Sequence, residues 1–405
     1  MTTLRLREWS TTSNLALTPR QRDALRQTFG ALVQPTAGST DTFDVTPSNT
    51  IGAVRVQDAT VLIEPKLPIS RVLFLLGYAT DPSGFGPGDA DLGVADDIVS
   101  GVTRLFTTLA RKATQRGLLS GYRSEEKSLH TVRGRIDLAE QLRRRPGVDL
   151  PLALRFQEYD EDILENQLLL AATAILRRLP QHDVVARAEL HRMNEALQNV
   201  SRIHYDSLAI PAVTWTRLNE QLRPSVELAR LLLSMQSPEA RNGGTTTPSL
   251  TIDMADLFET FVRTALREAL RATEDAFPGG DSCPTIHLDA RKMVRLKPDL
   301  SLWRERRCTF IGDIKYKRDS GSGHSADLYQ LLAYATATRL DEAMLVYALG
   351  PPVPRTHHVP AAGVRLHVEH LNLSEPPAGL LQQVQALAGR IATASAPGSA
   401  HAECP

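Results

Sequence analysis

An aspartate inside an apolar stretch restricts the possible folds of this sequence more than any other feature. Asp313 lies within the otherwise apolar run 310–314, whose composition is typical of a buried strand. A carboxylate in such a strand is costly unless it is paired or coordinated. Lys315 lies two positions later and therefore on the same face of the strand. The stretch predicts a strand that carries Asp313 and Lys315 into a site.

A second carboxylate precedes this strand. Asp299 lies in Lys297-Pro298-Asp299, fourteen positions before Asp313, and the runs 294–303 and 309–316 are predicted to be adjacent strands. Two acidic side chains that converge repel each other unless a hard divalent cation with oxygen ligands neutralises them. We therefore predict that Asp299 and Asp313 bind Mg²⁺, which also binds a substrate phosphate. Lys315 is predicted to orient or deprotonate the attacking water and to offset negative charge.

The residues around this pair of strands predict an α/β arrangement. Apolar residues at helical spacing over 254–269 predict an amphipathic helix before the strands, and 327–338 predicts a helix after them. An apolar third strand is predicted at 343–349. Gln330 and Tyr334, four residues apart, share one face of the second helix and could touch phosphate or the lysine.

Glu259 on the first of these helices is a candidate auxiliary acid, for a second metal ion or for hydrogen bonding. The motif also has an alternative interpretation, because Asp-Ile-Lys is common and is usually a strand with two solvated charges. The order helix, strand, strand, helix favours the interpretation as a catalytic site.

The rest of the chain predicts an α+β multidomain protein. A length of 405 residues exceeds what a single hydrophobic core usually supports. We predict a small β-rich N-terminal domain over 1–68, a mostly helical middle domain for partner docking over 69–240, and a C-terminal α/β domain over 250–394. Residues 395–405 are predicted to be a frayed tail.

Composition excludes several classes of protein. The 46 basic and 46 acidic side chains give a net charge of zero, which is unusual for a protein that grips DNA alone and suggests delivery by a partner. Three widely separated cysteines cannot build a disulfide framework or a CxxC zinc site. No apolar run approaches the roughly 20 residues that span a bilayer, so we expect a cytoplasmic protein without a membrane segment.

Several stretches together resemble the McrC family of the PD-(D/E)xK nuclease superfamily. The sequence similarity is greatest in Phe310-Ile-Gly-Asp-Ile-Lys-Tyr-Lys317 and Asp327-Leu-Tyr-Gln-Leu-Leu-Ala-Tyr334. Similar stretches upstream are Ile51–Val56, Val61–Pro68, Val132–Asp137 and Phe156–Gln167. The resemblance covers most of residues 50–350.

This resemblance implies a restriction-endonuclease-like C-terminal domain with its catalytic triad at Asp299, Asp313 and Lys315. The Gln and Tyr that the family carries on the following helix correspond to Gln330 and Tyr334. It implies the Mg²⁺-dependent endonuclease subunit of a modification-dependent (type IV, McrBC-like) restriction system, an antiviral defence. The implied partners are double-stranded DNA and an McrB-like AAA+ GTPase hexamer, which recognises modified cytosine and whose GTP hydrolysis the subunit stimulates. The sequence contains no G-x-x-x-x-G-K-[ST] phosphate loop, so we expect the motor to lie in the partner.

Two other functions fit the same residues. One is a non-catalytic adaptor that activates an AAA+ GTPase ring, and the other is a stand-alone PD-(D/E)xK repair nuclease. The polar residues of the middle region likewise have two interpretations, as ties between helices or as partner contacts; they are Arg133, Arg135, Glu158, Asp160, Asp162 and Asn166.

Overall fold

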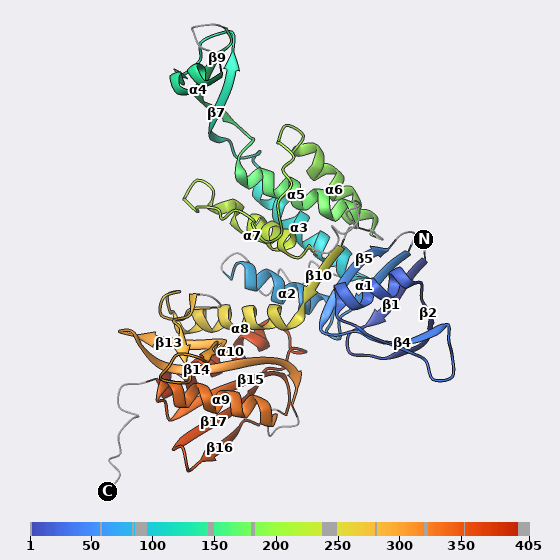
Figure 1. The fold of residues 1–405 in the computed structure, drawn as a ribbon, viewed down its shortest axis with the longest axis vertical. Coiled ribbons are helices and arrows are strands. Elements are labelled where there is room, and N and C mark those ends of the chain that lie inside the picture. The colour runs from blue at the N-terminus through green and yellow to red at the C-terminus, as the bar shows by residue number, and fades with distance from the viewer. Residues whose placement is uncertain are drawn as a thin grey trace. The chain divides into compact units, whose positions relative to one another are not determined.

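The protein is a mixed α and β structure with several separate sheets (Figure 1). The computed structural model describes residues 2–56, 59–82, 85, 95–144, 150–179, 183–236, 249–279, 282–319, 323–351 and 353–395. Contacts within the chain define two compact units, one formed by residues 1–101 with 251–405 and the other by 102–250. The expected α+β multidomain class is therefore confirmed. The three domain boundaries stay predictions, and residues 396–405 of the predicted tail lie outside the described residues.

The first unit begins with a sheet in the order β1-β6-β5-β10. Strand β1 (Thr2–Arg7) runs parallel to β6 (Ala59–Glu64), which pairs antiparallel with β5 (Thr50–Val56). Strand β10 (Ser249–Asp253) adds to the edge of β5, so two segments far apart in the sequence share this sheet. Near this edge, the Asn49 side-chain amide donates a hydrogen bond to Asp253 Oδ1 at 2.7 Å.

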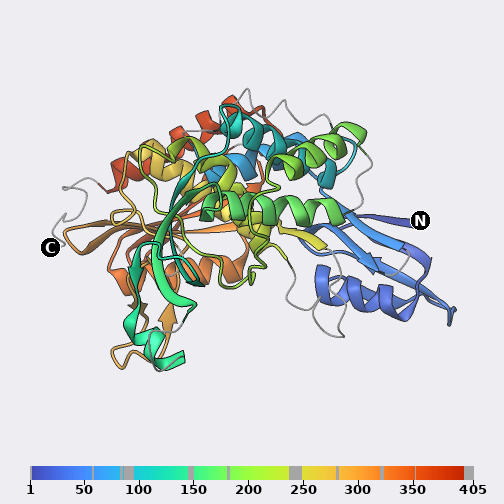
Figure 2. The same ribbon diagram turned by 90° about the horizontal axis from the view of Figure 1, so that it is seen from above.

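A second, three-stranded sheet and one helix complete the N-terminal part. Its order is β2 (Thr12–Ala16), β4 (Thr42–Thr46), β3 (Leu32–Pro35), and Figure 2 shows helix α1 (Pro19–Phe29) to one side of the N-terminal strands. The helix begins at Pro19 because Thr18 forms a reciprocal capping box with the third helical residue, Gln21.

The C-terminal part of the first unit is built on a five-stranded sheet. Its order is β13 (Leu300–Arg304), β14 (Arg307–Arg318), β15 (Glu342–Leu349), β17 (Val364–His370) and β16 (Arg355–Val359). The three central strands are parallel, and each edge strand is antiparallel to its neighbour. Two short strands, β11 (Ile286–His287) and β12 (Arg295–Leu296), pair separately.

Helices cover both faces of this sheet. Helix α9 (Ser325–Thr338) connects the parallel strands β14 and β15 and lies on one side, whereas α8 (Met254–Leu270) and α10 (Pro377–Ala394) lie on the other (Figure 2). Ile311 on β14 shares a buried cluster with Leu331 of α9. Because side chains alternate along a strand, Asp313 and Lys315 are on the same side as Ile311, facing α9.

The predicted elements of this part need one correction. The stretch 294–303 was expected to be a single strand, but it forms β12 and β13 with Pro298 and Asp299 between them. Proline has no N–H to contribute to a strand ladder, so the pairing is interrupted there. The C-terminal elements β16, β17 and α10 were not anticipated from the sequence.

The second unit is a group of helices with a projecting β-structure. Helix α3 (Ile98–Thr114) leads into it, and α5 (Leu164–Arg178), α6 (Val184–Ala196) and α7 (Arg223–Ser234) follow. Among the residues that the structure describes, no helix is both long and apolar enough to cross a membrane.

The middle region is less helical than predicted. Strand β7 (Gly121–Leu129) pairs along its whole length with β9 (Leu152–Asp160), and β8 (Arg135–Ile136) and helix α4 (Leu138–Arg144) lie between them in the sequence. We call residues 121–144 and 150–160 the arm; it extends away from α5, α6 and α7 (Figure 1). The sequence of β7 is almost entirely polar and therefore has no alternating apolar pattern that predicts a strand.

Gly312 offers a test of the packing between the central strands. A Cβ at this position would lie 2.7 Å from the Met344 carbonyl oxygen on β15. Gly312→Ala should therefore destabilise the protein by about 1–3 kcal/mol, measured by urea unfolding. Gly389→Ala on α10 is the control, because no described heavy atom outside the helix backbone lies within 4 Å of its Cβ, and it should be neutral or stabilising. Equal effects of the two changes would contradict the close packing of β14 on β15.

Candidate active site

Strand β14 presents Asp313 and Lys315 on the α9 side of the sheet. The Asp313 side chain is 1% exposed and the Lys315 side chain 26% exposed, so the two groups lie at the border between core and solvent. Lys315 Nζ forms an ion pair with Asp313 Oδ2. Apart from this contact, Asp313 Oδ2 has no hydrogen-bond partner among the described residues. The carboxylate is thus buried with an oxygen only partly satisfied.

Asp299 lies directly before β13 and is held against β14. The backbone N–H of Ile314 donates a hydrogen bond to Asp299 Oδ2 at 2.9 Å. Ile314 follows Asp313 in the strand, so this bond brings the Asp299 carboxylate beside the Asp313 carboxylate. The structure therefore brings together the three residues that the sequence predicts as the catalytic group.

The charges of these three residues are strongly coupled. Burial and the nearby Asp299 charge raise the pKa of Asp313 to about 8, although Lys315 acts in the opposite direction. Burial lowers the pKa of Lys315, but its attraction to Asp313 and Asp299 outweighs this and leaves the pKa above its ordinary value. Lys315 therefore stays positively charged at neutral pH, whereas Asp313 lacks enough positive charge around it to ionise readily.

Glu259 on α8 lies close to this group. Burial and the Asp299 charge raise the pKa of Glu259. Its carboxylate forms an ion pair with Arg263, one helical turn later, and Arg263 Nε donates a hydrogen bond to the Asp299 carbonyl at 3.3 Å. Sequence reasoning missed Arg263, although its position four residues after Glu259 places both on one face of the helix. Arg263 thus ties α8 to the backbone of Asp299.

Gln330 and Tyr334 on α9 are placed to hold the segment that carries Asp299. The Tyr334 hydroxyl donates to the Lys297 carbonyl at 3.0 Å, and the Gln330 side-chain amide donates to the Tyr334 hydroxyl at 2.7 Å. Tyr334 is 2% exposed, and burial and the Asp313 charge raise its pKa. The tyrosine hydroxyl is therefore engaged with protein backbone, while Gln330 is exposed and can also reach a ligand.

A buried polar network adjoins the site on the α9 side. Asp327, in the first turn of α9, forms an ion pair with Lys317 at 2.7 Å and accepts a hydrogen bond from the Tyr347 hydroxyl at 2.6 Å. The backbone N–H of His324 donates to the same hydroxyl at 3.0 Å. These contacts fix the start of α9 relative to β14 and β15. Sequence reasoning missed them because they join residues from separate elements.

The residues suit a magnesium ion better than a metal that needs many protein ligands. No group of three or more His, Cys, Asp or Glu side chains that could hold a metal occurs in the described part of the chain. Magnesium commonly binds through one or two carboxylates and completes its coordination with water and substrate phosphate. Asp299 and the partly unsatisfied Asp313 oxygen match this donor set. Their role as metal ligands stays a prediction.

Comparison with known proteins places the chain among restriction-system components. Residues 45–348 match the family model described as McrBC 5-methylcytosine restriction system component. The fold resembles a chain in the refined half-complex from the tetradecameric assembly of Thermococcus gammatolerans McrB AAA+ hexamers with bound McrC, at 17% identity and a TM-score of 0.61, covering 96% of this chain and 100% of that one. A chain of the Thermococcus gammatolerans McrBC complex shares 20% identity at a TM-score of 0.43, covering 66% and 88%. No curated protein matches the chain significantly.

The raised pKa of Asp313 predicts a pH-dependent stability in the absence of metal ions. The folded-state pKa of about 8 exceeds the unfolded value of about 3.9, so the folded protein binds more protons between these pH values and stability falls as the pH rises through them. Asp313→Asn removes the group and should reduce the loss of unfolding free energy between pH 5 and pH 8 by roughly 3–4 kcal/mol.

This prediction is measured by urea unfolding in EDTA at several pH values. Asp275→Asn, which changes an exposed carboxylate of the same unit, is the control and should keep the wild-type pH profile. Parallel profiles for the Asp313→Asn and wild-type proteins would show that Asp313 is ionised in the folded state.

Proposed function

Because the chain belongs to the family of McrBC 5-methylcytosine restriction system components, we propose that it is the subunit that cleaves DNA. In this proposal the C-terminal part is a PD-(D/E)xK nuclease domain, and Asp299, Asp313 and Lys315 are its catalytic residues. The observation that carries the proposal is the convergence of the two carboxylates and the lysine through the hydrogen bond from Ile314 to Asp299. Such a buried, under-neutralised acidic pair is costly for stability, which favours a catalytic role.

Asp299 and Asp313 would hold Mg²⁺ in this site. Bound there, the ion supplies a Lewis acid for a phosphate oxygen and a template for the attacking water. The hydrogen bond from Ile314 fixes Asp299 Oδ2, and the strand backbone fixes Asp313, so the two carboxylates are preorganised before the ion arrives. The raised pKa of Asp313 means that ion binding displaces a proton at neutral pH.

Lys315 acts through its positive charge and does not act as a general base. Its pKa lies above the ordinary value of lysine, so the ammonium group is protonated at neutral pH and can stabilise negative charge that develops on the phosphate. It can also orient the attacking water through a hydrogen bond. Tyr334 and Gln330 support the reaction indirectly, because they hold the Lys297 carbonyl and with it the turn that carries Asp299.

Cleavage should depend on each of these three residues. Asp299→Asn, Asp313→Asn and Lys315→Met should each lower the rate of phosphodiester hydrolysis by about a hundredfold or more, because each removes a charge from the reacting centre. The measurement uses methylated plasmid DNA, Mg²⁺, GTP and an McrB-like AAA+ GTPase as the partner. Asp275→Asn should cut at the wild-type rate, and wild-type cutting by the Asp313→Asn protein would refute the site.

We further propose that the chain docks on an AAA+ GTPase hexamer, as the similar Thermococcus gammatolerans structure contains McrB hexamers with bound McrC. The arm is the docking element within the second unit. It carries six large apolar side chains that are at least half exposed, namely Tyr122, Val132, Leu138, Leu142, Leu150 and Tyr159. Exposed apolar groups gathered on a projection are costly in water and mark an interaction surface.

The polar residues of the arm have a mainly structural role. Arg133 pairs with Glu158 at 3.1 Å and stacks on the Phe156 ring at 4.4 Å. Asp162 accepts hydrogen bonds from the backbone N–H and the hydroxyl of Ser201. These contacts stabilise the arm and its base, which leaves the exposed apolar residues as the candidates for partner contact.

Removal of exposed apolar side chains from the arm should weaken partner binding without changing the candidate active site. The rings of Tyr122 and Tyr159 lie 4.9 Å apart and are 77% and 63% exposed. Tyr122→Ser combined with Tyr159→Ser should weaken binding to the GTPase at least about tenfold and lower the stimulation of GTP hydrolysis in parallel. Surface plasmon resonance and a phosphate-release assay measure the two effects.

Val184→Ser combined with Val185→Ser is the matched control, because these residues are also highly exposed on the second unit but lie on α6. The control should bind and stimulate normally. Equal binding by both double variants would exclude the arm as the docking element. A second comparison distinguishes the nuclease role from the adaptor role: Asp313→Asn should lose cleavage but stimulate GTP hydrolysis normally.

A further inference from the structure

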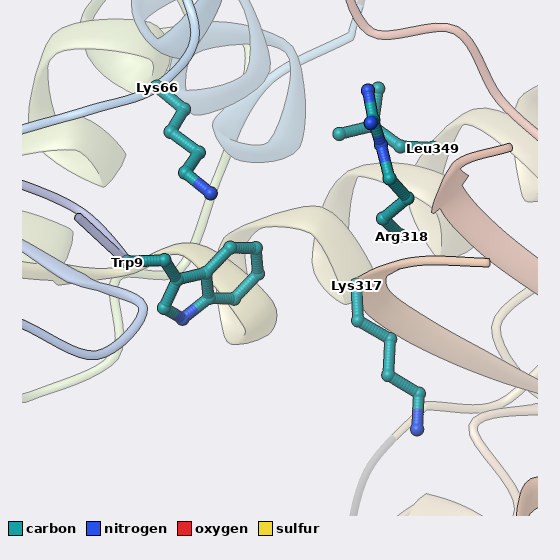
Figure 3. A pocket seen from close by; sticks show the side chains of 5 residues that line it. All are labelled: Trp9, Lys66, Lys317, Arg318 and Leu349. Carbon is teal, nitrogen blue, oxygen red and sulfur yellow. The ribbon is translucent and has the colours of Figure 1, made fainter. Parts of the chain in front are cut away.

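A basic pocket lies beside the candidate active site within the first unit. It has a volume of about 430 Å³ and is lined by Trp9, Lys66, Lys317, Arg318 and Leu349. Figure 3 shows Trp9 and Lys66 on one side of the pocket and Arg318 and Leu349 on the other, whereas the Lys317 side chain points away from them. The pocket thus combines residues from the N-terminal sheets with the end of the strand that carries Asp313 and Lys315.

The N-terminal side of the pocket is held in a defined position. The Trp9 ring lies 5.3 Å from the ring of Tyr316, which is the neighbour of Lys315 on β14. Beneath it, the fully buried Glu8 carboxylate accepts a hydrogen bond from the backbone N–H of Lys66 at 3.1 Å and one from the Tyr316 hydroxyl at 3.5 Å. These contacts fasten the N-terminal residues to the catalytic strand.

The backbone of Trp9 adopts an uncommon conformation at this position. Its φ of 51° lies in the left-handed region, which is costly for a bulky residue, and its N–H donates to the Pro47 carbonyl at 3.1 Å. Such a conformation persists only where the surrounding structure imposes it, and it is frequent at binding sites. Here it directs the indole ring into the pocket.

The charges of the pocket suit an anion. Lys66 and Arg318 are exposed, and within the described ranges neither forms an ion pair with a carboxylate. Lys66 Nζ instead lies 4.8 Å above the Trp9 ring. Lys317, in contrast, is engaged by Asp327. Two cations beside an aromatic ring and an aliphatic side chain match a phosphate joined to a sugar, the repeating unit of a nucleic acid strand.

The distance along β14 relates this pocket to the site of cleavage. The register with β15 shifts between Lys315, which pairs with Tyr347, and Arg318, which pairs with Leu349, so the two residues are only about 7 Å apart along the sheet. Lys315 faces α9, whereas Arg318 lies on the Tyr316 side, at the end of β14. A DNA backbone that passes the end of β14 can therefore contact the catalytic residues and Arg318.

We propose that the pocket formed by Trp9, Lys66, Arg318 and Leu349 binds the sugar-phosphate backbone of the cleaved DNA close to the scissile phosphate. A phosphate lies between Lys66 and Arg318, and its sugar packs on Trp9 and Leu349. This inference rests on the proposed nuclease function and assigns a DNA-positioning role to the N-terminal domain.

The test is the binding of a fluorescein-labelled 30-base-pair duplex to the full chain, with Ca²⁺ in place of Mg²⁺ to prevent cutting, between 50 and 200 mM salt. Lys66→Gln combined with Arg318→Gln should weaken binding about tenfold at the lowest salt and flatten the slope of log affinity against log salt by roughly one unit or more. Trp9→Ala should weaken binding severalfold with an unchanged salt slope, because it removes no charge.

The matched control is Arg20→Gln combined with Arg355→Gln, which also removes one exposed cation from each part of the first unit. It should bind the duplex as the wild type does. Equal affinities of the two double variants, or no binding by the wild-type chain at 50 mM salt, would overturn the inference. A failure of the nuclease proposal gives a different result. The wild-type chain would then bind DNA through this pocket but would not cut it in the presence of Mg²⁺, GTP and the partner.

Discussion

The hydrogen bond from the Ile314 backbone to the Asp299 carboxylate determines the geometry of the candidate site. It connects the turn before β13 to the middle of β14 and so places two carboxylates beside each other in a largely buried position. Lys315 alone does not neutralise both, and the pKa of Asp313 is raised as a result. The arrangement is unfavourable in the apoprotein, and the surrounding helices hold it together: Arg263 on α8 and Tyr334 on α9 both bind the segment that carries Asp299.

Strand β14 performs different tasks on its two faces. Asp313, Lys315 and Lys317 face α9, where they form the site and the ion pair with Asp327. Tyr316 points to the opposite side, where its ring lies 6.0 Å from that of Phe258 on α8 and its hydroxyl meets Glu8. The alternation of side chains along one strand thus links the candidate active site to the N-terminal sheets. A displacement of those sheets would shift Tyr316 and, through it, the neighbouring Lys315.

The local pattern of the sequence was sufficient to predict much of this. Period-two and helical apolar spacing predicted β14, α8 and α9, and the convergence of Asp299 with Asp313 and Lys315 followed from the two-residue repeat of a strand. The resemblance to the McrC family is confirmed by the family model. The arm was missed because β7 is almost entirely polar and pairs with β9 through its backbone, so it lacks the apolar alternation on which strand prediction depends; only β9 carries a small buried apolar cluster, formed by Leu152, Leu154 and Phe156. Arg263, Asp327 and Glu8 were missed because their contacts with Asp299, Tyr347 and Tyr316 join elements distant in the sequence.

The neutral net charge and the local basic pocket are consistent with each other. Binding of DNA by a chain with equal numbers of acidic and basic residues depends on where the cations lie, because long-range attraction is weak. In the proposed pocket, Lys66 and Arg318 would provide such a local contact without making the chain a strong non-specific DNA binder. A nuclease that holds DNA weakly by itself cuts little until another protein raises the local DNA concentration. For the nuclease that we propose, this charge distribution favours delivery to DNA by a partner.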